Sequence, residues 1–426
     1  MDAFIIKGSK SLKGEIEVRG AKNATLPILA ASLLTQESSV LDNLPLIEDV
    51  KKMITLLESF GVKITWLGER KIKIDPKNLN LDNLDQKLVK KIRGSVLLIA
   101  ALIHRFNKVK LAPPGGCFIG VRPIDAHIDG LRQLGVKVKM TPEYYCYDGS
   151  EMVAQEVILP EFSVTATENI LMLGSVLKGT TVVKIAAVEP HIEELVGVLN
   201  QMGAEIHLVN SHVFEIKGSR KLHGFSHYLE PDYLEAGTFM ILSAATKGRI
   251  IIHNVISRHL DLVMKKLQNI GVKMEIIKRA DGLEDVVMHP AYTLNSFKLQ
   301  TLPYPGIPTD LQAPFGVLAT ECNGTSLIFD PMYDGRLKYI DELVKMGANA
   351  LVADPHRALI TGPTVLNGVE INSLDIRAGM SLVIAALIAS GTTTLKEANE
   401  IDRGYEKIEE RLLKLGADIK RVNLSL

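Results

Sequence analysis

The feature that most constrains this fold is an internal repeat of about 70 residues. Six times, a helix-like stretch ends in an apolar residue and a glycine, and Val or Ala then begins an expected strand. These glycines are Gly61, Gly135, Gly203, Gly271, Gly347 and Gly416, and the successive spacings are 74, 68, 68, 76 and 69 residues. Each suits the left-handed position that ends a helix. Residues that occur in one repeat and are absent from the other repeats therefore indicate function rather than packing.

Each repeat predicts two helices of different character, followed by short strands such as 136–140, 179–183 and 391–395. The first helix is apolar on nearly every side and should be buried, whereas the second, as in 192–202 and 405–415, keeps a charged face. The buried helices are expected at 23–34, 94–104, 168–177, 235–245, 311–320 and 379–389. Helices enclosed by sheet are the reverse of a TIM barrel, so we predict an α/β (α+β) fold of the inside-out barrel kind.

The length of 426 residues is too great for one ordinary core. Six repeats fit two domains of three repeats each, and the spacings place them at 22–230 and at 1–21 plus 231–426. The first strand, expected from residue 1 to about residue 21, precedes a repeat that it cannot complete. We therefore expect it to pair with the C-terminal domain, and we expect the active site in the cleft between the domains.

Composition excludes several classes of protein. Lys plus Arg and Asp plus Glu each number 49, so no global field indicates a nucleic-acid or membrane-surface binder. No apolar run is long enough for a transmembrane helix, and no secretory signal is apparent. Three separated cysteines without CxxC spacing argue against zinc and disulfides. We expect a cytoplasmic protein that needs neither a metal nor a cofactor.

The starts of the buried helices are candidate anion sites, because unpaired N–H groups and the helix dipole favour negative charge there. Ser, Thr, Asp and Asn at these starts could serve as caps alone. Capping does not explain Lys22, Arg93 or Arg377, since a cation at a positive helix end is unfavourable without an anion. The residues at or before the starts are Lys22, Asn23, Arg93, 163–167, Asp232, Glu235, Thr309, Asp310 and 375–377.

The strongest departure from the repeat is the loop 113–123, Pro-Pro-Gly-Gly-Cys-Phe-Ile-Gly-Val-Arg-Pro. Its prolines and glycines are typical of a lid that moves along a defined path. Cys117 is expected to be exposed there, and Arg122 could lower the pKa of its thiol. The alternative is a small buried cysteine in a surface turn. Cys146 and Cys322 lack such surroundings and are interpreted as structural.

Several separated motifs then resemble one family along essentially the whole chain. They are Gly-Ala-Lys-Asn-Ala at 20–24, Pro-Gly-Gly-Cys at 114–117 with Ile-Gly and Arg-Pro after it, Pro-Gly-Ile-Pro-Thr-Asp-Leu-Gln at 305–312, and Asp-Arg-Gly-Tyr-Glu at 402–406. The family is that of the enolpyruvyl transferases that act on UDP-N-acetylglucosamine. Its fold, two domains of three βαβαββ units each, agrees with the six repeats.

The resemblance implies transfer of the enolpyruvyl group of phosphoenolpyruvate to the 3′-hydroxyl of UDP-N-acetylglucosamine, with release of phosphate. This is the first committed step of peptidoglycan synthesis. Addition followed by elimination needs an acid for carbon 3 of phosphoenolpyruvate and a base for the attacking hydroxyl. By the match, Cys117 is the proton donor, which can also become covalently linked to substrate, and Asp310 is the base.

The match also implies which residues bind the two small-molecule substrates. Phosphoenolpyruvate carries two anionic groups and needs several cations. Lys22, Arg122 and Arg403 match that set. The positions that line the UDP-sugar site are Asn23, Arg93, Arg122, Pro123, Ile124, Asp125, Ala126, Ser163, Val164 and Met332. Further polar cleft residues are Arg336, Asp375 and Arg377, with Glu189 as a weaker candidate.

Three positions depart from the family pattern. Thr165 stands where Gly is usual, Glu161 where some members have a basic residue, and Asp334-Gly335 where Glu-Asn is more typical. They bear on how uridine diphosphate is held rather than on the reaction type.

Three other functions are known on related scaffolds or are compatible with part of the pattern. The sister enzyme that acts on shikimate 3-phosphate lacks the cysteine loop. A non-catalytic sugar-nucleotide-binding relative would have lost the acid, the base or the cations. A relative that acts on RNA 3′-phosphate ends is disfavoured by a net charge of zero.

Overall fold

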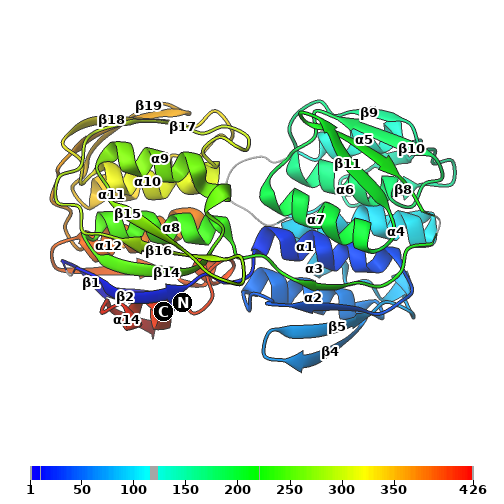
Figure 1. Cartoon of the computed structure of the whole chain (residues 1–426), viewed down its shortest axis with the longest axis horizontal. Coiled ribbons are helices and arrows are strands. Elements are labelled where there is room, and N and C mark those ends of the chain that lie inside the picture. Colours follow the sequence, from blue (N-terminus) through cyan, green and yellow to red (C-terminus); the bar gives the residue numbers. More distant parts are fainter. Residues whose placement is uncertain (1, 10, 116–122, 220, 425–426) are drawn as a thin grey trace. The chain divides into compact units, whose positions relative to one another are not determined.

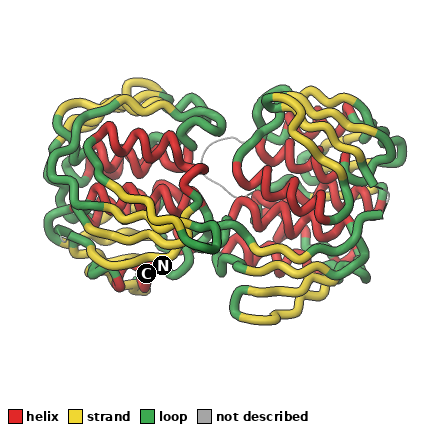
Figure 2. Tube along the Cα trace, viewed as in Figure 1, coloured by secondary structure: helices red, strands yellow, loops and turns green. Residues whose placement is uncertain are grey.

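In a computed structural model, the described residues are 2–9, 11–115, 123–219 and 221–424. They fall into two compact units. The N-terminal unit holds residues 20–115 and 123–230, and the C-terminal unit holds residues 2–19 and 231–424. In each unit, strands lie around a group of helices (Figures 1 and 2). The predicted inside-out α/β architecture is therefore confirmed within each unit.

The N-terminal unit contains three repeats. Its helices are α1 (Lys22–Ala31), α2 (Glu48–Ser59), α3 (Gln86–Lys91), α4 (Leu98–Phe106), α5 (Asp125–Gln133), α6 (Val164–Gly174) and α7 (Pro190–Gln201). Its strands are β3 (Ser39–Asp42), β4 (Lys63–Gly68), β5 (Lys71–Asp75), β6 (Lys108–Leu111), β7 (Lys137–Met140), β8 (Tyr145–Asp148), β9 (Glu156–Ile158), β10 (Thr180–Lys184), β11 (Glu205–Asn210), β12 (Val213–Lys217) and β13 (Ser226–Tyr228).

The C-terminal unit repeats the same plan. Its helices are α8 (Tyr233–Ala245), α9 (Asp261–Ile270), α10 (Gln312–Ala319), α11 (Tyr339–Lys345), α12 (Ile376–Ile388), α13 (Asn399–Asp402) and α14 (Ile408–Lys414). Its strands are β1 (Asp2–Lys7), β2 (Lys13–Glu17), β14 (Arg249–Val255), β15 (Met274–Lys278), β16 (Glu284–Met288), β17 (Lys298–Gln300), β18 (Gly324–Phe329), β19 (Asn349–Asp354), β20 (Arg357–Gly362), β21 (Glu370–Asn372), β22 (Thr392–Lys396) and β23 (Asp418–Asn423).

The expected buried helices are confirmed as α1, α4, α6, α8, α10 and α12. Every residue of α8 and α10 is buried, and in the C-terminal unit these two helices and α12 pack on one another. The expected bounds shift by up to four residues, and α12, for example, begins at Ile376 rather than at 379. In the second repeat the helix begins as a 3₁₀ turn, Arg93–Leu97, and in the third it begins at Val164 rather than at 168. The six repeat glycines all have positive φ, between 88° and 114°, as the left-handed helix end requires.

The sheets close each unit with strands from distant parts of the chain. Five of the six sheets formed by described residues combine one parallel pair of strands with two antiparallel pairs, for example β9 with β10, β11 and β12. In the first repeat, β13 supplies the parallel strand beside β3. At the chain's start, β1 lies between β22 and β23. Each unit thus closes upon itself around its buried helices.

The single first strand expected from residue 1 to about residue 21 is instead two strands in different sheets. The chain leaves β1 at Gly8, where an added Cβ would lie 2.1 Å from the Ala389 carbonyl oxygen. The following β2 then pairs in parallel with β14. The amphipathic helix expected at 405–415 is also shorter, because α14 begins at Ile408, after a left-handed residue at Lys407.

The sheet of the second repeat, β6-β8-β7, has no parallel strand among the described residues. The side chain of Gln86 bonds to the free edge of β6 instead. The amide of Gln86 donates to the Lys110 carbonyl at 3.0 Å and accepts from the Ala112 N–H at 2.8 Å. Gly115 packs just beyond, where an added Cβ would lie 1.8 Å from the Lys90 carbonyl oxygen. The segment of α3 therefore holds the chain that leads into residues 116–122.

Two features of the cores involve buried charge. Glu235 in α8 accepts two bonds from Arg411 of α14, at 2.6 and 3.1 Å, and one from the Arg19 N–H at 2.9 Å. In the N-terminal unit, burial and the neighbouring charge of Glu189 raise the pKa of Glu168 well above its ordinary value of 4.5.

No helix in the described ranges is long and apolar enough to cross a lipid bilayer.

The first prediction concerns Arg411. Its side chain is 9% exposed and that of Glu235 is 5% exposed, so Arg411→Met leaves a buried carboxylate without its guanidinium. We expect a loss of about 3–5 kcal/mol in the free energy of unfolding. The matched control is Arg279→Met, which removes an exposed pair with Asp281 and should cost less than about 1 kcal/mol. Equal losses in urea titrations of the two variants would contradict the role given to Arg411.

The second prediction concerns pH. Above pH 4.5 the unfolded chain releases the Glu168 proton while the folded protein keeps it, so this residue's contribution to stability falls as pH rises from there toward its raised folded pKa. Glu168→Gln has no proton to lose. The melting temperature of the variant should therefore rise relative to the wild type between pH 5 and pH 8. The exposed Glu193→Gln is the control; a constant difference for Glu168→Gln across this range would refute the prediction.

Candidate active site

The buried helices of the C-terminal unit begin with acidic residues. Asp232 caps α8 by accepting from the N–H groups of Leu234 and Glu235, at 2.8 and 3.3 Å. Asp375 caps α12 by accepting from the backbone N–H groups of Arg377 and Ala378, at 2.8 and 3.0 Å. Both acids therefore satisfy helix-end donors, as the capping interpretation predicts.

Asp310, at the start of the third buried helix, behaves differently. It lies inside a 3₁₀ turn, Thr309–Leu311, that precedes α10. Its Oδ1 accepts from Arg336 Nη2 at 2.7 Å, and its Oδ2 accepts from Arg377 Nε at 3.1 Å. The two arginine side chains are 8% and 7% exposed, whereas that of Asp310 is 23% exposed. One partly accessible carboxylate is thus held between two buried guanidinium groups.

The charges around these arginines outweigh their burial. Burial alone would lower the pKa of Arg336, but the carboxylates of Asp310, Asp375 and Asp330 raise it above its ordinary value. The pKa of Arg377 is also raised, because Tyr405, Asp310 and Asp232 oppose the effect of burial. Both guanidinium groups therefore stay charged.

Asp330 fixes the chain on either side of this site. It is fully buried and accepts from the hydroxyls of Thr301 and Thr309, at 2.8 and 2.6 Å, and from the Met332 N–H at 3.0 Å. Through these bonds one buried acid positions the residue before Asp310 and the predicted ligand residue Met332. The sequence analysis did not identify Asp330, because no repeat position or motif marks it.

Arg403 lies between α13 and α14. Its Nη1 donates to Glu400 Oε2 at 2.8 Å, and its side chain is 14% exposed. The neighbouring Asp402 instead accepts two bonds from Arg421, at 2.9 and 2.6 Å. Within this motif, Asp402 is therefore a structural acid, and the binding role of Arg403 stays a prediction.

In the N-terminal unit, Lys22 is the first residue of α1. Its Nζ lies 2.7 Å from Asp49 Oδ2, which belongs to the first turn of α2, and both side chains are largely buried. The anion that the sequence argument required at this helix start is thus supplied by the protein itself. The same holds for Arg377 with Asp310. The presence of a cation at one of these helix starts therefore does not, on its own, indicate a bound anionic ligand. Asn23 follows in the same turn and is half-buried.

The other predicted ligand residues of this unit occupy neighbouring segments. Arg93 donates from Nη2 to the Pro123 carbonyl at 3.3 Å. Pro123 and Ile124 lead into α5, whose first residues are Asp125 and Ala126. The structure therefore brings Arg93 to the stretch 123–126 that sequence matching grouped with it.

Ser163 and Val164 begin α6, and the departure at Thr165 has a structural explanation there. The Thr165 hydroxyl bonds to His127 Nε2 of α5 at 2.8 Å. A glycine at this position could not make that bond. Thr165 therefore ties the start of α6 to the first turn of α5. Asp334, another departure, pairs with His356 at 3.3 Å.

The predicted acid Cys117 and the predicted ligand Arg122 lie outside the described residues. The other two cysteines are described. Cys322 is buried, donates from Sγ to the Leu318 carbonyl, and has its thiol pKa raised to about 12 by burial. Cys146 is half-buried in β8.

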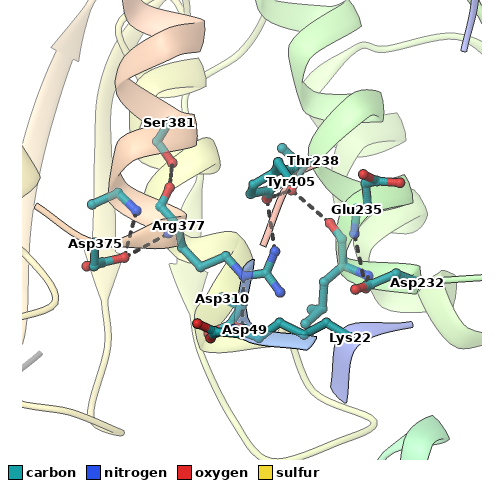
Figure 3. Close-up of polar contacts among 12 residues, drawn as sticks. Lys22, Asp49, Asp232, Glu235, Thr238, Asp310, Asp375, Arg377, Ser381 and Tyr405 are labelled. Atoms are coloured by element: carbon teal, nitrogen blue, oxygen red, sulfur yellow. Dashed lines mark hydrogen bonds and ion pairs between the residues drawn. The ribbon is translucent and has the colours of Figure 1, made fainter. Parts of the chain in front are cut away.

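Figure 3 shows how Asp310, Arg377 and Tyr405 are arranged around the starts of α8 and α12. Tyr405, from the Asp-Arg-Gly-Tyr-Glu motif, bonds to Arg377 Nη1 at 3.0 Å. Sequence matching used the arginine of this motif and missed the tyrosine. The arrangement places one carboxylate between two buried guanidinium groups near a helix start.

Comparison with known proteins gives the family. Residues 6–412 match the family profile described as EPSP synthase (3-phosphoshikimate 1-carboxyvinyltransferase). The chain is 40% identical over 427 residues to a UDP-N-acetylglucosamine 1-carboxyvinyltransferase of Finegoldia magna, covering all of both chains. It is 39% identical to UDP-N-acetylglucosamine 1-carboxyvinyltransferase 1 of Caldanaerobacter subterraneus, covering 98% of this chain and 99% of the relative.

Solved structures agree on the fold. The enolpyruvyl transferase NikO from Streptomyces tendae superimposes with a TM-score of 0.90 at 23% identity, covering 100% of this chain and 99% of that one. An EPSP synthase from Acinetobacter baumannii gives a TM-score of 0.74 at 17% identity, covering 99% and 100%. The resemblance predicted from the motifs is confirmed: this chain belongs to the EPSP synthase family of enolpyruvyl transferases, and within it to the UDP-N-acetylglucosamine 1-carboxyvinyltransferases.

Proposed function

We propose that this protein transfers the enolpyruvyl group of phosphoenolpyruvate to the 3′-hydroxyl of UDP-N-acetylglucosamine and releases phosphate. The observation that carries the proposal is the full-length similarity to proteins with that named activity. The reaction would be the first committed step of peptidoglycan synthesis, which serves cell-wall biogenesis, cell shape and division. A cytoplasmic location belongs to the same proposal.

Asp310 is proposed as the base that accepts the hydroxyl proton. A general base must be ionised and partly accessible, and Asp310 combines 23% exposure of its side chain with two charged partners. Cys117 is proposed as the acid for carbon 3 of phosphoenolpyruvate.

The anionic groups of the substrates need the predicted cations. Lys22, Arg122 and Arg403 are proposed to bind phosphoenolpyruvate. Asp49 holds Lys22 at the start of α1, so its ammonium is fixed before any substrate arrives. The residues proposed for the UDP-sugar are Asn23, Arg93, Arg122, Pro123, Ile124, Asp125, Ala126, Ser163, Val164, Met332, Arg336, Asp375 and Arg377, and Glu189 is a weaker candidate.

The third prediction tests the proposed substrates. Phosphate should be released when the protein is mixed with phosphoenolpyruvate and UDP-N-acetylglucosamine, and not when shikimate 3-phosphate replaces the UDP-sugar. The second acceptor is the necessary comparison, because the matching family profile carries the name of the shikimate enzyme. Phosphate release with shikimate 3-phosphate but not with UDP-N-acetylglucosamine would assign this protein to the shikimate enzyme instead. Binding of the UDP-sugar without release would favour a non-catalytic relative.

The fourth prediction concerns Cys117. Cys117→Ser should lose most activity at neutral pH, because a hydroxyl is a much weaker acid than a thiol, whereas Cys117→Asp should keep the acid function. The epoxide fosfomycin should inactivate the wild type and spare Cys117→Asp.

Mass spectrometry locates the epoxide adduct. The expected site is Cys117, since Cys322 is buried with its thiol pKa raised to about 12. Cys146→Ser is the matched control and should be inactivated like the wild type. An adduct at Cys146 would contradict the reactive role given to Cys117, and an inert Cys117→Asp would indicate that the proton comes from another group.

A further inference from the structure

Tyr405 is a fully buried tyrosine just before α14. Its hydroxyl makes two hydrogen bonds, one with Arg377 Nη1 and one with Thr238 Oγ1, both at 3.0 Å. The guanidinium carbon of Arg377 also lies 5.4 Å from the centre of the tyrosine ring. The side chain thus contacts the arginine that bonds Asp310, and nothing in the proposed reaction has used it (Figure 3).

The direction of each hydrogen bond among Arg377, Tyr405 and Thr238 follows from the groups at the two ends of the series. Arg377 can only donate, so the Tyr405 oxygen accepts from it. The Thr238 hydroxyl lies 2.7 Å from the Leu234 carbonyl, which can only accept, so its proton points there. Thr238 Oγ1 must then accept the proton of Tyr405. The result is a chain in one direction, from Arg377 through Tyr405 and Thr238 to the backbone of α8.

The tyrosine keeps its proton in this chain. Burial raises the pKa of Tyr405 above its ordinary value of 10.0, although the charge of Arg377 acts the other way. A neutral hydroxyl is what the chain requires, since only then can Tyr405 accept from Arg377 and donate to Thr238 at once.

The chain fixes one edge of the Arg377 guanidinium while Nε faces Asp310 Oδ2 at 3.1 Å. An arginine side chain has several rotatable bonds, and a single ion pair does not define its orientation. We infer that Tyr405 is a positioning residue for the base Asp310, acting through Arg377 and itself held by Thr238. The kinetic part of this inference rests on the proposed function, whereas the geometric part does not.

Four variants separate positioning from simple packing. Tyr405→Phe removes only the hydroxyl. Thr238→Val removes the acceptor of Tyr405, and Thr238→Ser restores a hydroxyl there. The matched control is Tyr339→Phe in the same unit, because Tyr339 is also fully buried and its hydroxyl accepts from Gln312 Nε2 at 3.2 Å.

The kinetic readout is phosphate release with phosphoenolpyruvate and UDP-N-acetylglucosamine. Misplacement of a catalytic group by a fraction of an ångström lowers the rate, so Tyr405→Phe should reduce kcat by about tenfold to a hundredfold. The KM of each substrate should change by less than about threefold. Thr238→Val should also lower kcat, Thr238→Ser should lie closer to the wild type, and Tyr339→Phe should keep its kcat.

The second readout needs no activity. In ¹⁵N NMR spectra of arginine side chains, the Nε–H signal of Arg377, assigned with Arg377→Lys, should exchange slowly with water in the wild type and in Tyr339→Phe. In Tyr405→Phe it should exchange at least about tenfold faster, because the guanidinium loses one of its anchors.

Two distinct failures can be told apart. If the wild type releases no phosphate, the proposed function is wrong, and the NMR signal alone decides the positioning role. If the wild type is active but Tyr405→Phe matches Tyr339→Phe in both kcat and Arg377 exchange, the inference is overturned. Loss of stability without loss of kcat in Tyr405→Phe would likewise make Tyr405 a packing residue only.

Discussion

Each repeat contains a helix that is apolar on nearly every side, and no single sheet can cover such a helix. Residues of α8 and α10 are all buried, which requires sheet and helix around them in every direction. Three repeats together meet this requirement, and strands from the chain ends complete the sheets, as β1 does between β22 and β23. Burial of these helices therefore determines both the threefold grouping and the long-range strand pairing.

The same burial decides where polar groups can lie. A buried helix has four backbone N–H groups at its start that its own turns cannot satisfy. Asp232 and Asp375 satisfy some of them, and the positive helix end stabilises the negative charges gathered there. Three buried acids of the C-terminal unit, Asp232, Glu235 and Asp375, lie at these starts, because most of the remaining length of each helix packs against apolar neighbours. The candidate site follows from the packing of the core.

The periodic part of this structure could be predicted from sequence, and the aperiodic part could not. The helices, the glycine helix ends and strands β7, β10 and β22 follow from burial patterns and turn chemistry that recur along the chain. Asp49 beside Lys22, Asp330 beside Thr309 and Tyr405 beside Arg377 are contacts between segments distant along the chain. No local pattern encodes such contacts. Two of the three cations at helix starts, Lys22 and Arg377, have protein anions as partners, whereas Arg93 donates to the Pro123 carbonyl.

The three acids at helix starts in the C-terminal unit show how one repeat position acquires a different role. Asp232 and Asp375 stand immediately before their helices and are occupied by backbone N–H groups. In the middle repeat Pro308 holds the position before the turn, and Asp310 follows two residues later, inside the 3₁₀ turn. Displaced from the capping position, its carboxylate accepts from Arg336 and Arg377 instead. A small shift along the chain thus separates an acid that stabilises a helix from one that can serve as a base.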